Sequence, residues 1–482
     1  MFGSIDATMI KAVTPEILVA VLGAIVLILD LIITDDGKRY LGWVTAVGLG
    51  IIMLVTFAIA PSGDGELLWG GMIRYDLTSF LFMELFLFGA AITALFAMDF
   101  RSISRRGEFY ILMLASTIGM LLLAAAADLI MVYVAFETVS IPMYILAGFF
   151  TGENKSTEAG FKYFLFGAMA SAIMVYGLSL LYGFTGTTNI YELARQFQAN
   201  GIETGLLVGS LLLILVGFLF KISAVPMHFW APDTYQGSPT PVAGLLSTAS
   251  KAAGFAVLIR VLIVAFPEIQ VQWGAIIAAI SVAAMTLGNL TAIAQKDIKR
   301  LLAYSSIAHA GYALIGIAAV SASGISSTMF YLIAYMVTNL AAFGIVAAVY
   351  RIVKSDKIED YAGLSRRSPW LALALMIALL SLSGMPPFAG FVTKVLVFAA
   401  AIEADMTWLA VIGVLNAIFG LYYYLTVLKV VYLYRSDKDD QKIPVTRPYA
   451  VALVVLTAGI ILIGTLFAPW FSWATTAAAS MF

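Results

Sequence analysis

GFLFKISAVPMHFWAPD, residues 217–233, interrupts a hydrophobic span with a lysine and then a proline. Proline has no N–H to donate, and its ring crowds the carbonyl four residues earlier, so Pro226 disturbs the helix at Ile222. We therefore predict that the helix loosens one turn beyond Lys221. Such broken spans are typical of transporters, in which the freed backbone groups line a site at mid-membrane.

A second hydrophobic stretch is broken in a related way. SLSGMPPFAGFVTK, residues 381–394, places two glycines and two prolines just before Lys394. The span that contains it covers about 370–400, which is overlong for a straight helix across a core of about 30 Å. Paired interrupted helices in two halves of a chain point to a transporter built from repeats, so we predict one break in each half.

Hydrophobic runs dominate the rest of the chain. Of its 482 residues, 62% are hydrophobic and 11% are charged, and the mean hydropathy is +0.99. Runs of 18 or more residues are typical of membrane helices, and they predict an all-α polytopic membrane protein with about 14 transmembrane helices. The predicted spans are 14–33, 41–60, 77–98, 109–127, 129–150, 162–184, 205–229, 240–266, 273–294, 301–321, 326–350, 370–400, 407–433 and 448–471.

The charges indicate how these spans are oriented. Loops after odd-numbered spans hold 19 of the 27 Lys and Arg residues. Positively charged loops face the cytoplasm, so this bias places both termini on the outer, periplasmic side. The connections are too short for a soluble domain, and the charged loop 351–369 is expected to anchor helix ends in solvent.

The broken spans are the seventh and the twelfth. An offset of five spans means opposite orientations in the membrane, so we predict two inverted five-helix repeats, flanked by three N-terminal helices and one C-terminal helix. The predicted segments are 1–108, 109–266 (spans 4–8), 273–433 (spans 9–13) and 434–482. Lysine precedes proline in one break and follows it in the other, which leaves open whether Lys221 or Lys251 is the counterpart of Lys394.

The residue types present exclude several kinds of chemistry. The chain has no cysteine and two histidines, His228 and His309. Disulfides, thiolate metal sites and cysteine-ligated iron–sulfur clusters are therefore excluded. There is also no phosphate-binding P-loop or dinucleotide fingerprint. We predict that this chain binds no metal and no cofactor, and that nucleotide chemistry takes place elsewhere.

Three lysines, Lys221, Lys251 and Lys394, lie deep in hydrophobic spans. A lysine at the centre of a membrane helix costs about 2.5–3.5 kcal/mol, so such residues usually serve ion or proton pathways. Burial disfavours the charged form and a nearby carboxylate favours it, so a buried lysine can both take up and release a proton. We predict that these three lysines carry protons.

Glu137 lies midway along the fifth span. A lone carboxylate at this depth is expected to be neutralised or paired. Lys221 is its natural partner, since no other cation of the first repeat is as central. One interpretation is a structural ion pair; the one we favour is a counter-charge that tunes the proton affinity of Lys221.

Other ionisable groups have two interpretations each. His309 is either a neutral histidine bonded to a Ser or Tyr, or a relay between Lys251 and Lys394. Lys162, at the cytoplasmic start of the sixth span, is either an entrance residue or an anchor. His228, just past the first break, indicates interfacial structure more than a relay.

Cations near helix ends have a simpler explanation. Lys429 and Arg260 can reach the interface or pair locally, so we predict structural roles for both. In the eleventh span, by contrast, four polar residues share one helix face, which should turn to the protein interior and hold water. These residues are Tyr331, Tyr335, Thr338 and Asn339.

Three longer segments resemble the antiporter-like subunits of respiratory complex I. They are FKISAVPMHFWAPDTYQGSPTPVAGLLSTASKAAGF (220–255), QKDIKRLLAYSSIAHAGY (295–312) and GLSRRSPWLALALMIALLSLSGMPPFAGFVTK (363–394). The core of the resemblance runs from about the fourth span to the thirteenth, and the layout of 14 spans extends it over the chain. The resemblance implies proton-channel roles for Glu137, Lys221, Lys251 and Lys394, with Lys162 on the entrance side.

The resemblance also implies a setting. It implies a proton-translocating subunit of an NADH–quinone oxidoreductase in the bacterial inner membrane, with translocation coupled to quinone reduction in neighbouring subunits. NADH, FMN, Fe–S clusters and quinone would be bound by those neighbours. The expected partners are the antiporter-like subunit M, the small subunits K, J and A, and the lipid bilayer, but no nucleic acid. The alternatives are a subunit of a multisubunit cation/proton antiporter and a structural membrane subunit without its own pathway.

Overall fold

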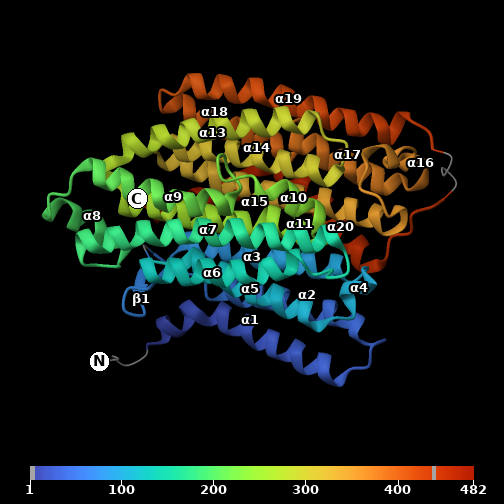
Figure 1. Cartoon of the computed structure of the whole chain (residues 1–482), viewed down its shortest axis with the longest axis horizontal. Coiled ribbons are helices and arrows are strands. Elements are labelled where there is room, and N and C mark those ends of the chain that lie inside the picture. The colour runs from blue at the N-terminus through green and yellow to red at the C-terminus, as the bar shows by residue number, and fades with distance from the viewer. Residues whose placement is uncertain (1–5, 64, 437–440, 482) are drawn as a thin grey trace.

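The computed structural model describes residues 6–63, 65–436 and 441–481, and it is almost entirely helical (Figure 1). The N-terminal half contains α1 (Ala7–Ile32), α2 (Leu41–Ala58), α3 (Leu77–Ala97), α4 (Arg101–Ser104), α5 (Gly107–Ala125), α6 (Leu129–Ala147), α7 (Asn154–Thr185), α8 (Ile190–Ala199), α9 (Thr204–Ile222), α10 (Trp230–Gly237), α11 (Thr240–Leu245) and α12 (Lys251–Arg260). The C-terminal half contains α13 (Gln270–Ile293), α14 (Ile298–Ala318), α15 (Ala322–Val353), α16 (Leu364–Arg367), α17 (Pro369–Ser383), α18 (Ala389–Glu403), α19 (Thr407–Leu433), α20 (Arg447–Thr465) and α21 (Phe467–Ala479). Strands β1 (Glu66–Leu68) and β2 (Ile73–Tyr75) form a short antiparallel hairpin.

The predicted all-α membrane fold is confirmed. Thirteen helices of the described ranges are long and apolar enough to cross a membrane, and α17 is a shorter apolar helix. The eighth predicted span is continuous in space but is built from α11, a π-helical turn at Leu246–Ser250, α12 and a second π-helical turn at Val261–Ala265. The predicted limits agree with the observed helices to within a few residues for most spans.

The fourteenth predicted span, 448–471, is wrong at its C-terminal end. Helix α20 stops at Thr465, and a separate helix, α21, starts at Phe467. The physical reason is Pro469, whose ring would crowd the carbonyl of Thr465 in a continuous helix. The sequence contains that proline, but the hydrophobic run masks its effect.

Both predicted helix breaks are present, and they follow the same backbone course at residues 219–226 and 380–387. The residue after each helix is left-handed, with φ of 57° at Ser223 and 88° at Gly384. The next residue donates its N–H to the carbonyl five residues earlier, at 2.9 Å and 3.0 Å respectively. Each segment then ends in a cis peptide bond to proline. The two breaks are therefore equivalent structures.

The two breaks can be aligned residue by residue. In the register of the two breaks, Lys221 is level with Leu382, and Lys394 is level with Asp233. In this register, neither Lys221 nor Lys251 is level with Lys394. The two halves place their lysines on opposite sides of the same break.

A second pair of equivalent contacts lies at the starts of α6 and α14. Asp128 and Asp297 each cap their helix and each form an antiparallel bridge with a loop that follows a 32-residue helix, at Asn189 after α7 and Lys357 after α15. Asp297 lines a cavity with residues that follow the end of α6, whereas Asp128 caps its start. The same contact therefore occurs at opposite ends of the bundle. On this basis we propose that 109–266 and 273–433 are the two inverted repeats.

Helices α14 and α15 lie at the centre of the molecule, between α1 at one edge and α19 at the other (Figure 1). The most apolar 18-residue windows of α14 and α15 are 94% and 100% buried, against 33% for α1. Polar side chains on α14 and α15 are therefore shielded from lipid.

Glycines hold α13 close against α14. A Cβ at Gly311 would lie 2.7 Å from the backbone nitrogen of Met285 and 2.8 Å from the carbonyl oxygen of Ser281. A Cβ at Gly288 would lie equally close to the backbone of α14. Any larger residue must push the two helices apart, because the obstacles are backbone atoms.

We expect Gly311→Ala to destabilise the folded subunit by about 1–3 kcal/mol, the usual cost of overpacking a close-packed interior. Thermal unfolding of the purified complex would measure it. The matched control is Gly209→Ala, because a Cβ at Gly209 meets nothing within 4 Å. Equal melting temperatures for the two variants would contradict the conclusion that the close approach of α13 and α14 at Gly311 stabilises the subunit.

Candidate functional site

Lys221 lies in the last turn of α9, where the helix stops one residue later. Its side chain is buried, and its Nζ donates to Ser140 Oγ on α6 at 2.9 Å. The ammonium also lies 4.9 Å from the centre of the Phe136 ring. A helix C-terminus carries partial negative charge, so the break that ends α9 also favours a cation at this position.

Glu137 lies one turn before Ser140 on α6. Its carboxylate accepts a hydrogen bond from Ser171 on α7. Within the described ranges, no ion pair forms between Glu137 and Lys221: Ser171 binds the carboxylate and Ser140 binds the ammonium. The predicted partnership is therefore indirect, because Ser140 and Ser171 take the hydrogen bonds of the two charged groups.

Lys251 begins α12 directly after the π-helical turn. Its Nζ donates to both the Oγ and the carbonyl oxygen of Ser306 on α14, at 2.6 Å and 2.7 Å. One turn further along α12, a Cβ at Gly254 would lie 3.0 Å from Cγ of Lys221. The stem of Lys221 thus packs against the helix that carries Lys251.

One face of α14 continues from Lys251 toward the second half. It carries Ser306, His309 and Tyr312, spaced by three residues. His309 is buried and hydrogen-bonded through both ring nitrogens, Nδ1 to the Tyr331 hydroxyl at 2.6 Å and Nε2 to the Tyr424 hydroxyl at 3.3 Å. With a rise of 1.5 Å per residue, this face extends about 9 Å from Ser306 to Tyr312.

Lys394 lies at the other end of that face. Its Nζ lies 4.9 Å from the centre of the Tyr312 ring and donates to the carbonyl oxygens of Leu382 and Ser383, at 3.1 Å and 2.8 Å. These are among the last carbonyls of α17, which the break leaves without partners inside the helix. The face of α14 therefore extends from Ser306, which binds Lys251, to Tyr312, whose ring lies beneath Lys394.

The polar stripe predicted for the eleventh span faces inward, as expected. Tyr331 bonds His309, and the Tyr335 ring stacks on His309 with centroids 5.0 Å apart. A cavity of about 10 Å³ lies between this stripe and α17, which is room for about one water molecule. The stripe on α15 therefore lines the buried polar region together with the polar face of α14.

Lys162 lies in a charged cluster instead of the lysine series. Its Nζ is 2.6 Å from carboxylate oxygens of both Glu158 and Asp233, and Arg300 contacts the second oxygen of Asp233, also at 2.6 Å. Burial alone would raise the pKa of Asp233, but the hydrogen bonds from Lys162 and Arg300 lower it below its ordinary value. The cluster ties α7, α10 and α14 together, which supports the anchor interpretation of Lys162.

The remaining predicted residues lie apart from the lysine series. His228 is buried in the first break with its ring against Phe229, and its Nδ1 has no partner within the part of the chain described. Lys429 is exposed and lies over the ring of Tyr434. Arg260 is fully buried in a network around Asp76. These contacts agree with the structural roles predicted for Lys429 and Arg260.

Several hydroxyl groups that bind the ionisable residues were not predicted: Ser140, Ser171, Ser306, Tyr312 and Tyr424. Ser140 lies three positions after Glu137, and Ser306 and Tyr312 each lie three positions from His309, so a spacing of three was an available signal for these. Ser171 and Tyr424 come from facing helices, and the sequence gives no such signal for them. In the described ranges, no group of three or more His, Asp or Glu side chains is placed to hold a metal ion.

Comparison with known proteins identifies the class. A family model described as "NADH:quinone oxidoreductase/Mrp antiporter, TM" matches residues 126–420. The chain superimposes on a chain of respiratory complex I from Thermus thermophilus with a TM-score of 0.80, 34% identity, and coverage of 95% of this chain and 98% of the other. It also shares its fold with a chain of the Mrp complex from Dietzia sp., with a TM-score of 0.86, 21% identity, and coverage of 98% and 97%. The broken helices and buried lysines thus belong to an antiporter-like membrane subunit.

Two curated relatives narrow this class. NADH-quinone oxidoreductase subunit N of Trichlorobacter lovleyi is 40% identical over 94% of both chains. The subunit N of Moorella thermoacetica is 42% identical over 97% of this chain and 98% of its own. The chain belongs to the subunit N family of the NADH-quinone oxidoreductases. The predicted resemblance is confirmed, and with it a proton-translocating, multi-pass membrane subunit of that enzyme.

Proposed function

We propose that this subunit moves protons along Lys221, Lys251, the polar face of α14, and Lys394. The observation that supports the path most directly is that face, since Ser306 binds Lys251 and Tyr312 underlies Lys394. His309 between them has both ring nitrogens in hydrogen bonds. It can therefore pass a proton by exchanging its partners without moving far.

Glu137 is the proposed switch of this path. Its carboxylate is held by Ser171, one turn from the serine that binds Lys221. A small movement of the carboxylate toward or away from Lys221 would raise or lower the proton affinity of the lysine. Moving one proton against 100 mV needs about 2.3 kcal/mol, and a change of about two pK units in proton affinity supplies a similar energy.

The energy for this switch would come from outside the chain. We propose that quinone reduction in neighbouring subunits acts on Glu137 through electrostatic or conformational coupling. Antiporter-like subunit M and the small subunits K, J and A are the proposed neighbours, and NADH, FMN, Fe–S clusters and quinone are bound by other subunits. The Lys/Arg-rich loops face the cytoplasm of a bacterial inner membrane, with both termini outside.

Neutralising Glu137 tests the proposal. We expect Glu137→Gln to slow proton translocation per assembled complex by roughly tenfold, since about 1.4 kcal/mol of lost charge interaction changes proton affinity tenfold. NADH-driven acidification of inverted membrane vesicles measures it, normalised to the subunit content of the complex. Glu203→Gln, at an exposed carboxylate, is the control. Unchanged translocation in an assembled Glu137→Gln complex would favour a purely structural subunit.

A further inference from the structure

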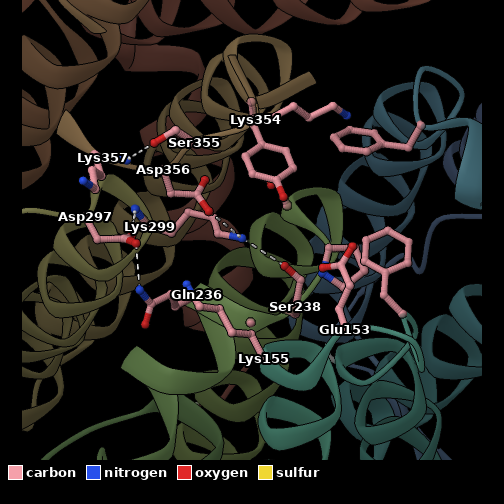
Figure 2. A pocket seen from close by; sticks show the side chains of 16 residues that line it. Glu153, Lys155, Gln236, Ser238, Asp297, Lys299, Lys354, Ser355, Asp356 and Lys357 are labelled. Atoms are coloured by element: carbon pink, nitrogen blue, oxygen red, sulfur yellow. Dashed lines mark hydrogen bonds and ion pairs between the residues drawn. The ribbon is translucent and has the colours of Figure 1, made fainter. Parts of the chain in front are cut away.

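A cavity of about 240 Å³ opens at the end of the bundle where the Lys/Arg-rich loops gather (Figure 2). Both halves of the chain line it. Glu153 is the N-cap residue of α7 and Lys155 lies in its first turn, and Asp297 and Asp356 come from the second half. We call this cavity the vestibule. It has room for several waters and lies where the two inverted repeats meet.

The floor of the vestibule is a loose ion pair. Lys299 is buried, and its Nζ lies 3.6 Å from Asp356 Oδ2 and donates to the Ser238 carbonyl oxygen at 3.1 Å. The other oxygen of Asp356 has no hydrogen-bond partner in the described ranges. Burial raises the pKa of Asp356 above its ordinary value despite the nearby Lys299. A buried carboxylate oxygen without a protein partner indicates that water reaches it.

Buried hydroxyl groups without partners continue inward from this floor. Ser238, Thr234 and Tyr235 lie at the end of α10 within one turn of each other, and none of their hydroxyl oxygens is hydrogen-bonded within the described ranges. The hydroxyl oxygen of Ser223, in the first helix break, also has no hydrogen-bond partner within the described ranges. The Tyr235 hydroxyl lies near both Ser223 and Ser306, and Ser306 binds Lys251. The series therefore ends at the partner of Lys251.

Dry packing would make this series costly. An unsatisfied buried hydroxyl costs about 1–3 kcal/mol, and four such groups in sequence would be a large fraction of the stability of a domain. Water molecules that bridge them remove this cost and connect the vestibule to Lys251. The rival entrance, Lys162, is held between the carboxylates of Glu158 and Asp233.

We propose that the vestibule is the aqueous mouth of the proton path, and that waters along Ser238, Thr234 and Tyr235 connect it to Ser306 and Lys251. Lys299 and Asp356 position the first of these waters. This inference rests on the proposed function, because it assigns the route by which protons reach Lys251.

Thiol accessibility tests the route in the assembled complex. The chain has no cysteine, so Ser238→Cys carries the one thiol of this subunit. In inverted vesicles, a membrane-impermeant cationic methanethiosulfonate should modify it at least tenfold faster than Ser281→Cys, as read by mass spectrometry of the subunit. Ser281 is the matched control, because it is equally buried and its Oγ donates to the Gly311 carbonyl oxygen at 2.7 Å. Modification of Ser238→Cys should also lower proton translocation.

Two outcomes would overturn the proposal: equal modification rates for the two variants, or complete modification at residue 238 with unchanged translocation. A second variant covers the case in which Ser238→Cys does not assemble. Thr234→Val keeps the shape but removes one hydroxyl of the series, and it should slow translocation severalfold. Thr93→Val, whose hydroxyl bonds the Gly89 carbonyl oxygen within its own helix, should not. Equal rates for these two variants would also overturn it. Normal translocation in Lys251→Ala would overturn the proposed function. Normal translocation in the vestibule variants, combined with a loss in Lys251→Ala, would overturn only this route.

Discussion

Replacing Lys251 by alanine is expected to abolish proton translocation through this subunit and the NADH-driven turnover coupled to it. Lys251 is the group that the first half presents to the face of α14, through two hydrogen bonds to Ser306. Alanine offers no group that takes up or releases a proton, so the series would be interrupted at its centre. The measurement is the ratio of protons translocated to electrons transferred, in vesicles that contain equal amounts of assembled complex.

Two further variants separate the possible causes of this loss. Lys251→Arg keeps a positive charge but does not deprotonate in a protein, so we expect it to fail as well. Lys429→Ala removes an exposed lysine from α19 and should translocate normally. A normal proton-to-electron ratio in Lys251→Ala would remove this lysine from the path. Normal translocation in Lys251→Arg would show that charge, and not proton exchange, is what the position provides.

The sequence predictions that proved accurate rest on interactions within a single helix. Pro226 and the prolines after Gly384 determine where the helices break, because a missing N–H acts on the same chain within one turn. The stripe that contains Tyr331 and Tyr335 is read from a period of three to four residues. Its inward orientation follows because lipid leaves a polar face no other partner. Features of this kind need no knowledge of the tertiary fold.

Contacts between distant segments were not predictable in the same way. Ser171 is hydrogen-bonded to Glu137, and Ser140 to Lys221, because α6, α7 and α9 meet at a depth that the sequence does not specify. The sequence identifies Lys299 only as one of many positively charged loop residues, although the fold buries it on the floor of the vestibule. A serine in a hydrophobic span has many possible partners, and only packing selects one.

Arg260 gives the largest expected effect on stability. It is fully buried, and its guanidinium donates to Asp76 Oδ2 at 2.8 Å and Oδ1 at 3.0 Å, with further bonds to Ser79, Tyr191 and the Ala124 carbonyl oxygen. Asp76 also caps α3. The pair thus joins the N-terminal helices to the first repeat.

We expect Arg260→Met to destabilise the subunit by about 3–5 kcal/mol, because methionine fills much of the space but removes the guanidinium that is hydrogen-bonded to the buried Asp76 carboxylate. Arg74, whose Nε lies 3.7 Å from Asp76 Oδ2, remains but is the more distant of the two cations. The measurable result is loss of the subunit from the assembled complex at growth temperature, seen by native electrophoresis. Arg195→Met, which removes an exposed arginine 3.8 Å from Glu192, should assemble normally.

The double variant Arg260→Met/Asp76→Asn decides whether the buried charge is the cause. Neutralising the carboxylate removes most of the penalty, while the asparagine side chain can still cap α3. Partial recovery of assembly is therefore expected. If the double variant assembles no better than Arg260→Met, the loss comes from missing packing and not from an unpaired charge. If Arg260→Met itself assembles normally, water or a neighbouring subunit replaces the guanidinium, and the network is not what holds α3 to the first repeat.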